Sequence, residues 1–178
     1  FDAITEKAEG IIKDLKDLGV SCKFDKRTTH RPGAKFAQHE LQGVPLRIAI
    51  GPKDIENNTI ELARRDTLTK EIVQMGGLAH TIKDLLEVIQ DELYNKALNY
   101  RDEHITKVDD FETFKKVLEN KTGFISAHWD GTSESEQKIK ELTKATIRCI
   151  PLDNELEEGV CVYSGEPSTQ RVLFAKAY

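Results

Sequence analysis

The chain has 178 residues, of which 38% are hydrophobic and 32% charged, and its formal net charge is -5. This length suits one ordinary domain or two small ones with modest cores. No apolar run approaches the ~20 residues needed to span a bilayer and no signal peptide is visible, which excludes a membrane-spanning protein. The three cysteines, Cys22, Cys149 and Cys161, are irregularly spaced and favour a reducing cytosol over a disulfide framework. Because the chain begins without Met, we expect a piece of a longer protein.

Charge is distributed unevenly along the chain. The segment from Lys23 to Lys35 carries five cationic residues against the single acid Asp25, a net charge of +4. The segment from Asp153 to Glu166 carries five acids and no Lys or Arg. A local basic patch in an otherwise acidic protein is the electrostatic footprint expected of an RNA-binding surface.

The first 75 residues predict an α/β domain with a mixed sheet. Apolar residues at helical spacing run from Ile4 to Leu18, and Gly19 is placed to end this helix. Val20 to Asp25 alternates apolar and polar residues, which predicts a strand. The domain class follows because helices and strands alternate. The other elements predicted here are a helix over 33–42, a strand over 44–50, loops at 51–52 and 57–58, and a hairpin over 60–73 with its turn at 66–69.

The rest of the chain predicts a long helix and then a small α/β module. Apolar residues at helical spacing from Leu78 to Ala97 give a helix well above the common ~11 residues, which suits a connector. The module after it is near the lower size limit for folding unaided. Its predicted elements are helices over 111–118 and 134–142 and strands over 123–129, 146–150 and 171–174. The predicted organisation is a domain over 1–75, a connecting helix over 76–106 and a C-terminal module over 107–178.

The sequence offers no strong catalytic motif. It lacks a phosphate loop of the Walker type and a Gly-rich dinucleotide fingerprint. His128 with Cys149 or Cys161 is a weak candidate for a nucleophile and its base. Because buried cysteine commonly behaves as a small hydrophobe, we favour a structural role for these residues. We therefore predict no catalytic residue in this chain, and a small Cys/His enzyme stays as an alternative.

The strongest local signal is the tract from Asp25 to Phe36, which follows the predicted strand and runs into a helix. Loops held by a rigid scaffold are where recognition residues tend to lie. The turn at Pro32-Gly33 places backbone N–H groups at a helix start, where they can meet phosphate. Phe36 either stacks on a base or fills the core, and its helical spacing favours the core. A solvated surface loop is the other interpretation of the charges. The charged candidates are Asp25, Arg27, Arg31, Lys35 and, one helix later, Glu40.

Separated motifs along the chain carry a family resemblance. They are Lys35-Phe36, Glu40-Leu41-Gln42-Gly43-Val44-Pro45-Leu46-Arg47, Gly51-Pro52-Lys53-Asp54, Arg64-Arg65-Asp66, Asn95-Lys96-Ala97-Leu98, Tyr100-Arg101, Arg148-Cys149-Ile150-Pro151 and the ending from Arg171 to Tyr178. In this order they resemble the anticodon-binding and C-terminal domains of prolyl-tRNA synthetases of the type with a C-terminal extension. The resemblance covers essentially the whole chain. The family's domain also has a strand before its first helix, and we expect that strand to be missing here.

The resemblance implies a class II synthetase that activates proline with ATP and magnesium and attaches it to tRNA(Pro) in the cytoplasm. The catalytic domain would precede Phe1 and be this fragment's partner within a homodimeric enzyme. The fragment would recognise the anticodon of tRNA(Pro) without a cofactor of its own, and the carboxylate of Tyr178 would dock toward the aminoacylation site. The alternative is a free-standing accessory or protein-interaction module built on an anticodon-binding-like fold.

Recognition of guanine gives the resemblance a physical basis, because proline anticodons end in two guanines. Guanine exposes O6 and N7 acceptors, which suit Arg or Lys, and N1–H and N2–H donors, which suit a carboxylate. Unstacked loop bases expose both edges. We therefore predict that the anticodon is read by Asp25, Arg27, Arg31, Lys35 and Glu40.

The resemblance also raises the question of zinc. The family's C-terminal module often holds zinc through a Cys-x4-Cys pair and a Cys-x2-Cys pair. The corresponding positions here are Asp130, Ser135, Cys161 and Ser164. Structural zinc sites use four Cys or His ligands, so we predict that this chain binds no metal.

Overall fold

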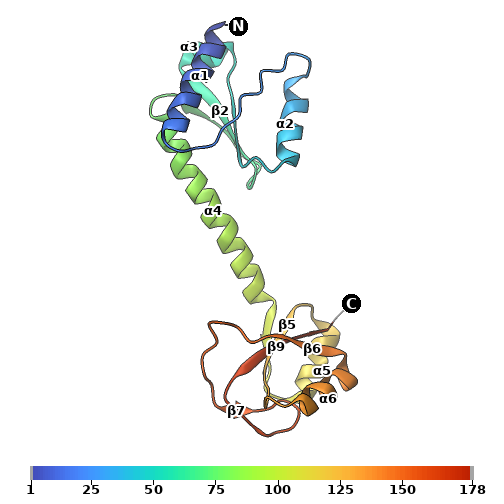
Figure 1. Cartoon of the computed structure of the whole chain (residues 1–178). Coiled ribbons are helices and arrows are strands. Elements are labelled where there is room, and N and C mark those ends of the chain that lie inside the picture. The colour runs from blue at the N-terminus through green and yellow to red at the C-terminus, as the bar shows by residue number, and fades with distance from the viewer. Residues whose placement is uncertain (1, 177–178) are drawn as a thin grey trace. The chain divides into compact units, whose positions relative to one another are not determined.

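The computed structural model describes residues 2–176, and their contacts divide the chain into two compact units, residues 1–96 and 97–178. The division falls inside one long helix, α4 (Leu78–Glu103), which is drawn in green in Figure 1. The α/β class, the long helix and the presence of a mixed sheet are confirmed. The mixed sheet was predicted for the first unit but lies in the second, and the sheet of the first unit is antiparallel. The division at 1–75, 76–106 and 107–178 stays a prediction. None of the helices described has both the length and the apolar character needed to cross a membrane.

The first unit is built on three antiparallel strands in the order β1-β2-β3. Leu46 pairs with Arg64, and Thr59 pairs with Gln74, which confirms the predicted hairpin. The long irregular segment 18–31 joins the first two helices (Figure 1). The elements are α1 (Asp2–Asp17), α2 (Pro32–Leu41), β1 (Leu46–Ala49), α3 (Pro52–Asn57), β2 (Thr59–Arg64), β3 (Lys70–Gln74) and the first part of α4.

The core of the first unit forms where the apolar stripe of α1 meets β2 and the start of α4. Ile11 and Leu15, one helical turn apart, are buried against Ile60 and Leu62, which lie on the same face of β2. Met75, Leu78 and Ile82 complete this cluster. Because α1 carries these residues at helical spacing, the sequence pattern predicted both the helix and the face that it buries.

Two predictions for the first unit are wrong. Residues Val20–Asp25, predicted as a strand, have no regular secondary structure and form no ladder with the described strands. Val20 and Cys22 do pack on the core, so alternation predicted the buried side chains without supplying a strand to pair with. Helix α3 was not predicted, and it takes in Pro52 and Asn57 from the two predicted loops at 51–52 and 57–58. Pro52 occupies its first turn, and the Asp54 carboxylate accepts a hydrogen bond from the Gly51 N–H at 2.8 Å.

The second unit contains the mixed sheet, in the order β4-β5-β9-β6. β4 runs parallel to β5, whereas β9 is antiparallel to both β5 and β6. Its core centres on the aromatic pair Phe114 and Phe174, whose ring centroids are 5.2 Å apart. The elements are β4 (Ile105–Lys107), α5 (Phe111–Asn120), β5 (Phe124–His128), α6 (Ser133–Thr143), β6 (Ala145–Cys149), β7 (Gly159–Val160), β8 (Pro167–Ser168) and β9 (Arg171–Lys176). The helices and the three longer strands were predicted, whereas β4, β7 and β8 were not.

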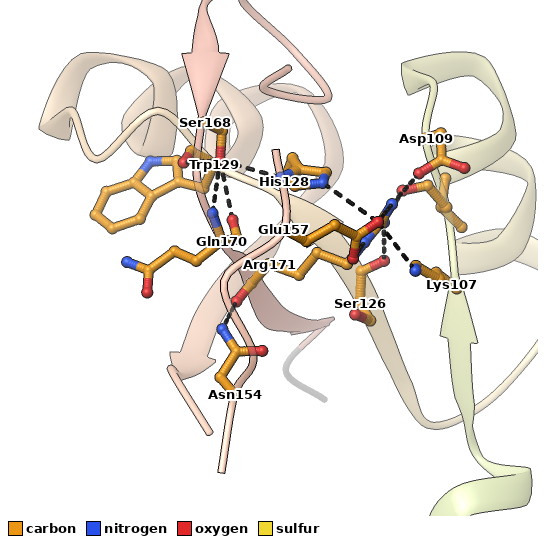
Figure 2. Close-up of polar contacts among 11 residues, drawn as sticks. Lys107, Asp109, Ser126, His128, Trp129, Asn154, Glu157, Ser168, Gln170 and Arg171 are labelled. Carbon is orange, nitrogen blue, oxygen red and sulfur yellow. Dashed lines mark hydrogen bonds and ion pairs between the residues drawn. The ribbon is translucent and has the colours of Figure 1, made fainter. Parts of the chain in front are cut away.

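A buried arginine ties the segment before β7 to the sheet (Figure 2). Arg171 is 7% exposed, and its Nε donates to Glu157 Oε2 at 2.9 Å. Its Nη1 donates to the backbone oxygens of Val108 at 3.1 Å and Ser126 at 3.3 Å, and its Nη2 to the carboxylate of Asp109. Each nitrogen of this guanidinium therefore has a partner, which is what burial of a charged group requires.

Candidate nucleic-acid interface

Two of the five predicted site residues, Arg27 and Lys35, converge on a third, Asp25. Arg27 donates from Nε to Asp25 Oδ1 at 2.8 Å and from Nη2 to Oδ2 at 2.6 Å. Lys35 Nζ donates to the Asp25 carbonyl oxygen at 3.1 Å and lies 3.8 Å from Oδ1. His39, which the sequence reasoning did not select, lies with Nε2 3.1 Å from Asp25 Oδ2. These contacts fasten the segment before α2 to the body of α2.

The environment keeps Asp25 ionised. The hydrogen bond from Arg27 is the main cause, and together with that from His39 it outweighs desolvation, so the pKa of Asp25 lies well below its ordinary value. The same interaction raises the pKa of Arg27. Because its oxygens already accept several hydrogen bonds, Asp25 is better suited to hold Arg27, Lys35 and His39 in place than to accept hydrogen bonds from a base.

Arg31 and Glu40 lie at opposite ends of α2. Arg31 is the N-cap residue and Glu40 the penultimate residue, and both side chains are exposed. Nine residues of helix separate them by about 14 Å, so the two side chains are too far apart to read one base together. The Glu40 carbonyl accepts a hydrogen bond from Arg65 Nε at 2.8 Å, which brings the end of the β2 strand against α2.

A half-buried arginine on β1, Arg47, is the functional candidate that the sequence reasoning missed. Its guanidinium carbon lies 3.6 Å from the centre of the Phe36 ring, and its Nη1 donates to Glu61 Oε1 at 3.1 Å. Among the side-chain nitrogens and oxygens of residues 2–176, Arg47 Nε is buried without a hydrogen-bond partner. Buried polar groups are normally paired, so such an atom calls for an explanation, and a ligand acceptor is one.

Arg47 and Phe36 line a cavity of about 840 Å³ that lies between α1, residues 20–25, α2 and β1. Its polar lining combines cations with carboxylates and includes Lys35, His39, Glu40, Arg47, Asp54 and Glu61. Its apolar lining comes mainly from α1 and β1. A planar aromatic group bearing both donors and acceptors would match this mixture, because the cations can donate and the carboxylates accept.

A smaller pocket of about 190 Å³ adjoins Arg47 between α2 and the hairpin. Its charged lining is Glu40, Arg47, Arg64, Arg65 and Lys70. Hydrogen bonds and ion pairs from Arg64 to Asp66 and Glu92 partly offset this positive charge and raise the pKa of Arg64. Arg65 and Lys70 are exposed and remain available to an anion.

The Cys/His alternative finds no support in the contacts of His128. His128 is 4% exposed, with Nδ1 3.1 Å from Ser168 Oγ and Nε2 3.8 Å from Glu157 Oε1 (Figure 2). The Ser168 hydroxyl is placed to donate to the backbone oxygen of Trp129 at 2.8 Å or of Gln170 at 2.9 Å. These buried contacts serve packing of β8 against β5. The other predicted contact residue, Tyr178, lies outside the described residues.

Two known family models match the chain, one in each unit. Residues 1–85 match the family model described as "Anticodon binding domain". Residues 111–178 match the model described as "Prolyl-tRNA synthetase, C-terminal". The first match covers Arg47, all five predicted site residues and all of the cavity lining except Leu86, and it defines the unit as an anticodon-binding domain.

Curated relatives extend both matches across the chain. It is 63% identical over its full length to the "Proline--tRNA ligase" of Flavobacterium psychrophilum and 62% identical to that of Christiangramia forsetii. It is 56% identical to that of Porphyromonas gingivalis over 98% of its length. The chain spans 36%, 36% and 35% of these relatives. It belongs to the prolyl-tRNA synthetase family and corresponds to the part that carries the anticodon-binding and C-terminal domains.

Proposed function

We propose that the first unit binds the anticodon of tRNA(Pro) and that Arg47 is the centre of its base-reading surface. The observation that carries this proposal is the buried Arg47 Nε, which has no partner within residues 2–176, in a residue that lines the cavity of about 840 Å³. A guanine that entered the cavity could accept from Arg47 through O6 or N7. Its N1–H and N2–H groups would find carboxylates on the same lining, among them Glu40 and Glu61.

Phe36 has a defined part in this proposal. Its ring already supports the Arg47 guanidinium from one side at 3.6 Å. A guanidinium held flat on a ring loses little freedom when it binds, and its other face remains a stacking surface for a base. The sequence spacing favoured the core over base stacking for Phe36, whereas its contact with Arg47 supports a role at the binding surface.

The predicted reading residues take different parts in the proposal. Arg31 and Glu40 are exposed and would contact RNA directly. Asp25 would act as a positioning residue, because its carboxylate holds Arg27, Lys35 and His39. The Arg27 side chain is 37% exposed in this arrangement, so it still presents its charge to a phosphate.

For the whole protein we propose the activity that the resemblance implies: ATP- and magnesium-dependent attachment of proline to tRNA(Pro). This chain would supply recognition, and the upstream catalytic domain would supply the chemistry. A homodimer acting in the cytoplasm belongs to the same proposal. The alternative of a free-standing accessory module is not favoured, because proline--tRNA ligases match the chain along its entire length.

The test is a filter-binding titration of the 178-residue chain against tRNA(Pro) and a variant with an anticodon guanine replaced by adenine. We expect Arg47→Met to weaken binding to the cognate tRNA by about 10–100-fold, because a good arginine–guanine contact contributes ~1–3 kcal/mol. The same change should weaken binding to the adenine variant far less. Arg148→Met, an exposed arginine in the second unit, is the matched control. Equal discrimination by the native chain and the Arg47 variant would contradict the proposal.

Salt dependence separates base reading from phosphate contacts. We expect Arg47→Met to leave the slope of log affinity against log salt nearly unchanged. Removal of an exposed phosphate contact such as Lys70 should instead reduce that slope by about one unit. A change of slope with Arg47→Met and no loss of guanine preference would assign Arg47 to phosphate binding.

A further inference from the structure

Three hydrogen-bonding residues meet at positions that the family resemblance assigns to zinc ligands. Asp130 follows β5, Ser135 lies in the first turn of α6, and Ser164 lies in the turn after β7. Ser135 Oγ donates to Asp130 Oδ1 at 2.6 Å, and Ser164 Oγ donates to Asp130 Oδ2 at 2.5 Å. The Asp130 carboxylate therefore binds both the start of α6 and the turn at Ser164, which is 34 residues after Asp130 in the chain.

The fourth position, Cys161, lies in the same turn as Ser164. Its N–H donates to the Glu166 carbonyl at 2.8 Å, and its carbonyl accepts from the Gly165 N–H at 3.0 Å. The next residue, Val162, donates to the His128 carbonyl at 3.0 Å, so the turn is held against the end of β5. The Cys161 side chain is 2% exposed and packs as a small apolar group.

The donor set at these positions does not fit structural zinc. Such sites use four thiolates or imidazoles, whereas three of these four residues carry a carboxylate or a hydroxyl. The Asp130 oxygens are also occupied, because Oδ1 accepts from the Thr132 N–H at 2.9 Å and from Thr132 Oγ1 at 2.8 Å, besides the serines. Within residues 2–176, no cluster of three or more His, Cys, Asp or Glu side chains is placed to hold a metal.

We propose that Asp130, Ser135 and Ser164 form a hydrogen-bonded clasp that does the cross-linking work of a metal ion in this module. A tetrahedral ion would join the end of β5, the start of α6 and the turn after β7. The clasp joins these same three elements through one ionised carboxylate, and charge-assisted hydrogen bonds of this kind are the strong ones. The module's stability is then independent of metal supply.

The charge state of Asp130 agrees with this role. Burial alone would raise its pKa, but hydrogen bonds from Ser135, Ser164 and Thr132 outweigh burial and hold the pKa well below its ordinary value. Trp129 lies beside the clasp and donates from Nε1 to Ser135 Oγ at 3.0 Å. It is the single tryptophan of the chain, so its fluorescence reports on this part of the second unit.

The first test compares chelation with disruption of the clasp in the 178-residue chain, by thermal unfolding followed through tryptophan fluorescence. We expect Asp130→Ala to lower the melting temperature by about 5–10 °C and Ser164→Ala by about 2–5 °C. Ser133→Ala, an exposed serine of the same helix as Ser135, is the control and should change it by less than ~1 °C. Treatment of the unmodified chain with EDTA should have no effect.

Two results would overturn the clasp. One is unmodified chain that contains stoichiometric zinc and melts lower after EDTA treatment. The other is an Asp130→Ala variant that melts like the unmodified chain. If Asp130→Ala does not fold, the milder Ser164→Ala variant decides, because an unchanged melting temperature there counts equally against the clasp.

The second test rebuilds the metal site. With Asp130→Cys, Ser135→Cys and Ser164→Cys together, Cys161 becomes the fourth thiol of a Cys-x4-Cys and Cys-x2-Cys set. We expect the reduced triple variant to bind one equivalent of Co²⁺ with the visible spectrum of tetrahedral thiolate coordination. Its melting temperature should then become sensitive to EDTA. Absence of that spectrum in a folded variant would show that the four positions do not converge, and would overturn the proposal.

Discussion

Arg171 and Arg47, one in each unit, both have guanidinium nitrogen buried from solvent, and they differ in how completely it is hydrogen-bonded. Arg171 donates to two carboxylates and two backbone carbonyls (Figure 2). Arg47 donates to Glu61, lies on Phe36 and keeps a buried Nε without a partner in the described chain. A saturated arginine holds its own unit together, whereas an under-satisfied one retains hydrogen-bonding capacity for a ligand. This difference supports the proposed division between a structural arginine, Arg171, and a recognition arginine, Arg47.

The largest effect that would follow from this difference is on the stability of the second unit. Arg171→Met should destabilise it by about 2–4 kcal/mol, because the carboxylates of Glu157 and Asp109 lose their common partner and two carbonyls lose a donor. Urea unfolding followed by tryptophan fluorescence measures the change. Arg148→Met is the control, since Arg148 makes a single long hydrogen bond of 3.4 Å to the Ala175 carbonyl. Equal stabilities of the Arg171→Met and Arg148→Met variants would contradict a structural role for Arg171.

The corresponding change in the first unit should affect binding and not folding. Arg47→Met is expected to change the free energy of unfolding by less than ~1 kcal/mol, because it breaks one partly exposed ion pair and also removes a buried nitrogen without a partner. Far-ultraviolet circular dichroism during urea unfolding measures it, with Glu61→Gln as the matched variant. A loss as large as that of Arg171→Met would show that Arg47 is structural, and the comparison between the units would fail.

Acid should act on the second unit through Glu157. Hydrogen bonds from Arg171 and then Lys107 lower the pKa of Glu157 to about 2. A depressed pKa contributes stability above the unfolded value of about 4.3, and this contribution is lost as the pH falls toward 2. The Glu157→Gln variant should therefore lose less stability than the unmodified chain between pH 5 and about 2.

Thermal melts at several pH values, read by tryptophan fluorescence, test this slope. Glu155→Gln is the control, because Glu155 is an exposed acid on the same segment. Lys107, His128 and Arg171 all face Glu157, and none of them is mutated in the chains compared. Parallel curves for the native chain and Glu157→Gln would assign the acid sensitivity to other carboxylates, such as Asp130.

The smallest effect is expected at an exposed ion pair of the first unit. Arg64 Nη2 lies 2.5 Å from Glu92, whose side chain is 53% exposed, but Arg64 also pairs with the more buried Asp66. Glu92→Gln should change the free energy of unfolding by less than ~0.5 kcal/mol. Asp66→Asn should cost more, and chemical denaturation of both variants compares them. A larger loss of stability in Glu92→Gln than in Asp66→Asn would mean that the exposure of the carboxylate does not determine how much each ion pair contributes to stability.

Local patterns predicted much of the fold. The stripe from Ile4 to Leu18 gave α1 and its buried face, and the alternation at 44–50 gave β1 within a few residues. The same alternation failed at Val20–Asp25, because a strand also needs a neighbouring backbone edge, and no sequence pattern supplies one. Gly51, Pro52 and Asp54 form a helix-start signature for α3. The helix was not predicted because Gly51-Pro52 and Asn57-Asn58 at its two ends are also typical of loops.

The candidate site was harder to predict than the fold. Basic clustering identified Arg27 and Lys35. It did not identify His39, which lies fourteen residues from their partner Asp25 and also contacts the Asp25 carboxylate. Arg47 sits in a strand pattern as a polar residue that should face away from the core, and that pattern does not reveal a stack on Phe36. Both contacts are tertiary, so they follow from how the elements pack and not from spacing within one element.

The long helix α4 has a practical consequence for handling this chain. Its buried residues, Leu78, Ile82 and Ile89, all lie in its first half, and within 90–103 only Leu98 is even half-buried. That second half is held by its own backbone hydrogen bonds, and an isolated helical stretch of this length is marginal in water. Transient opening there gives a protease an extended segment, with Lys96 exposed as a trypsin site, while both cores stay folded. Limited digestion should therefore cut within this stretch first and release two folded fragments.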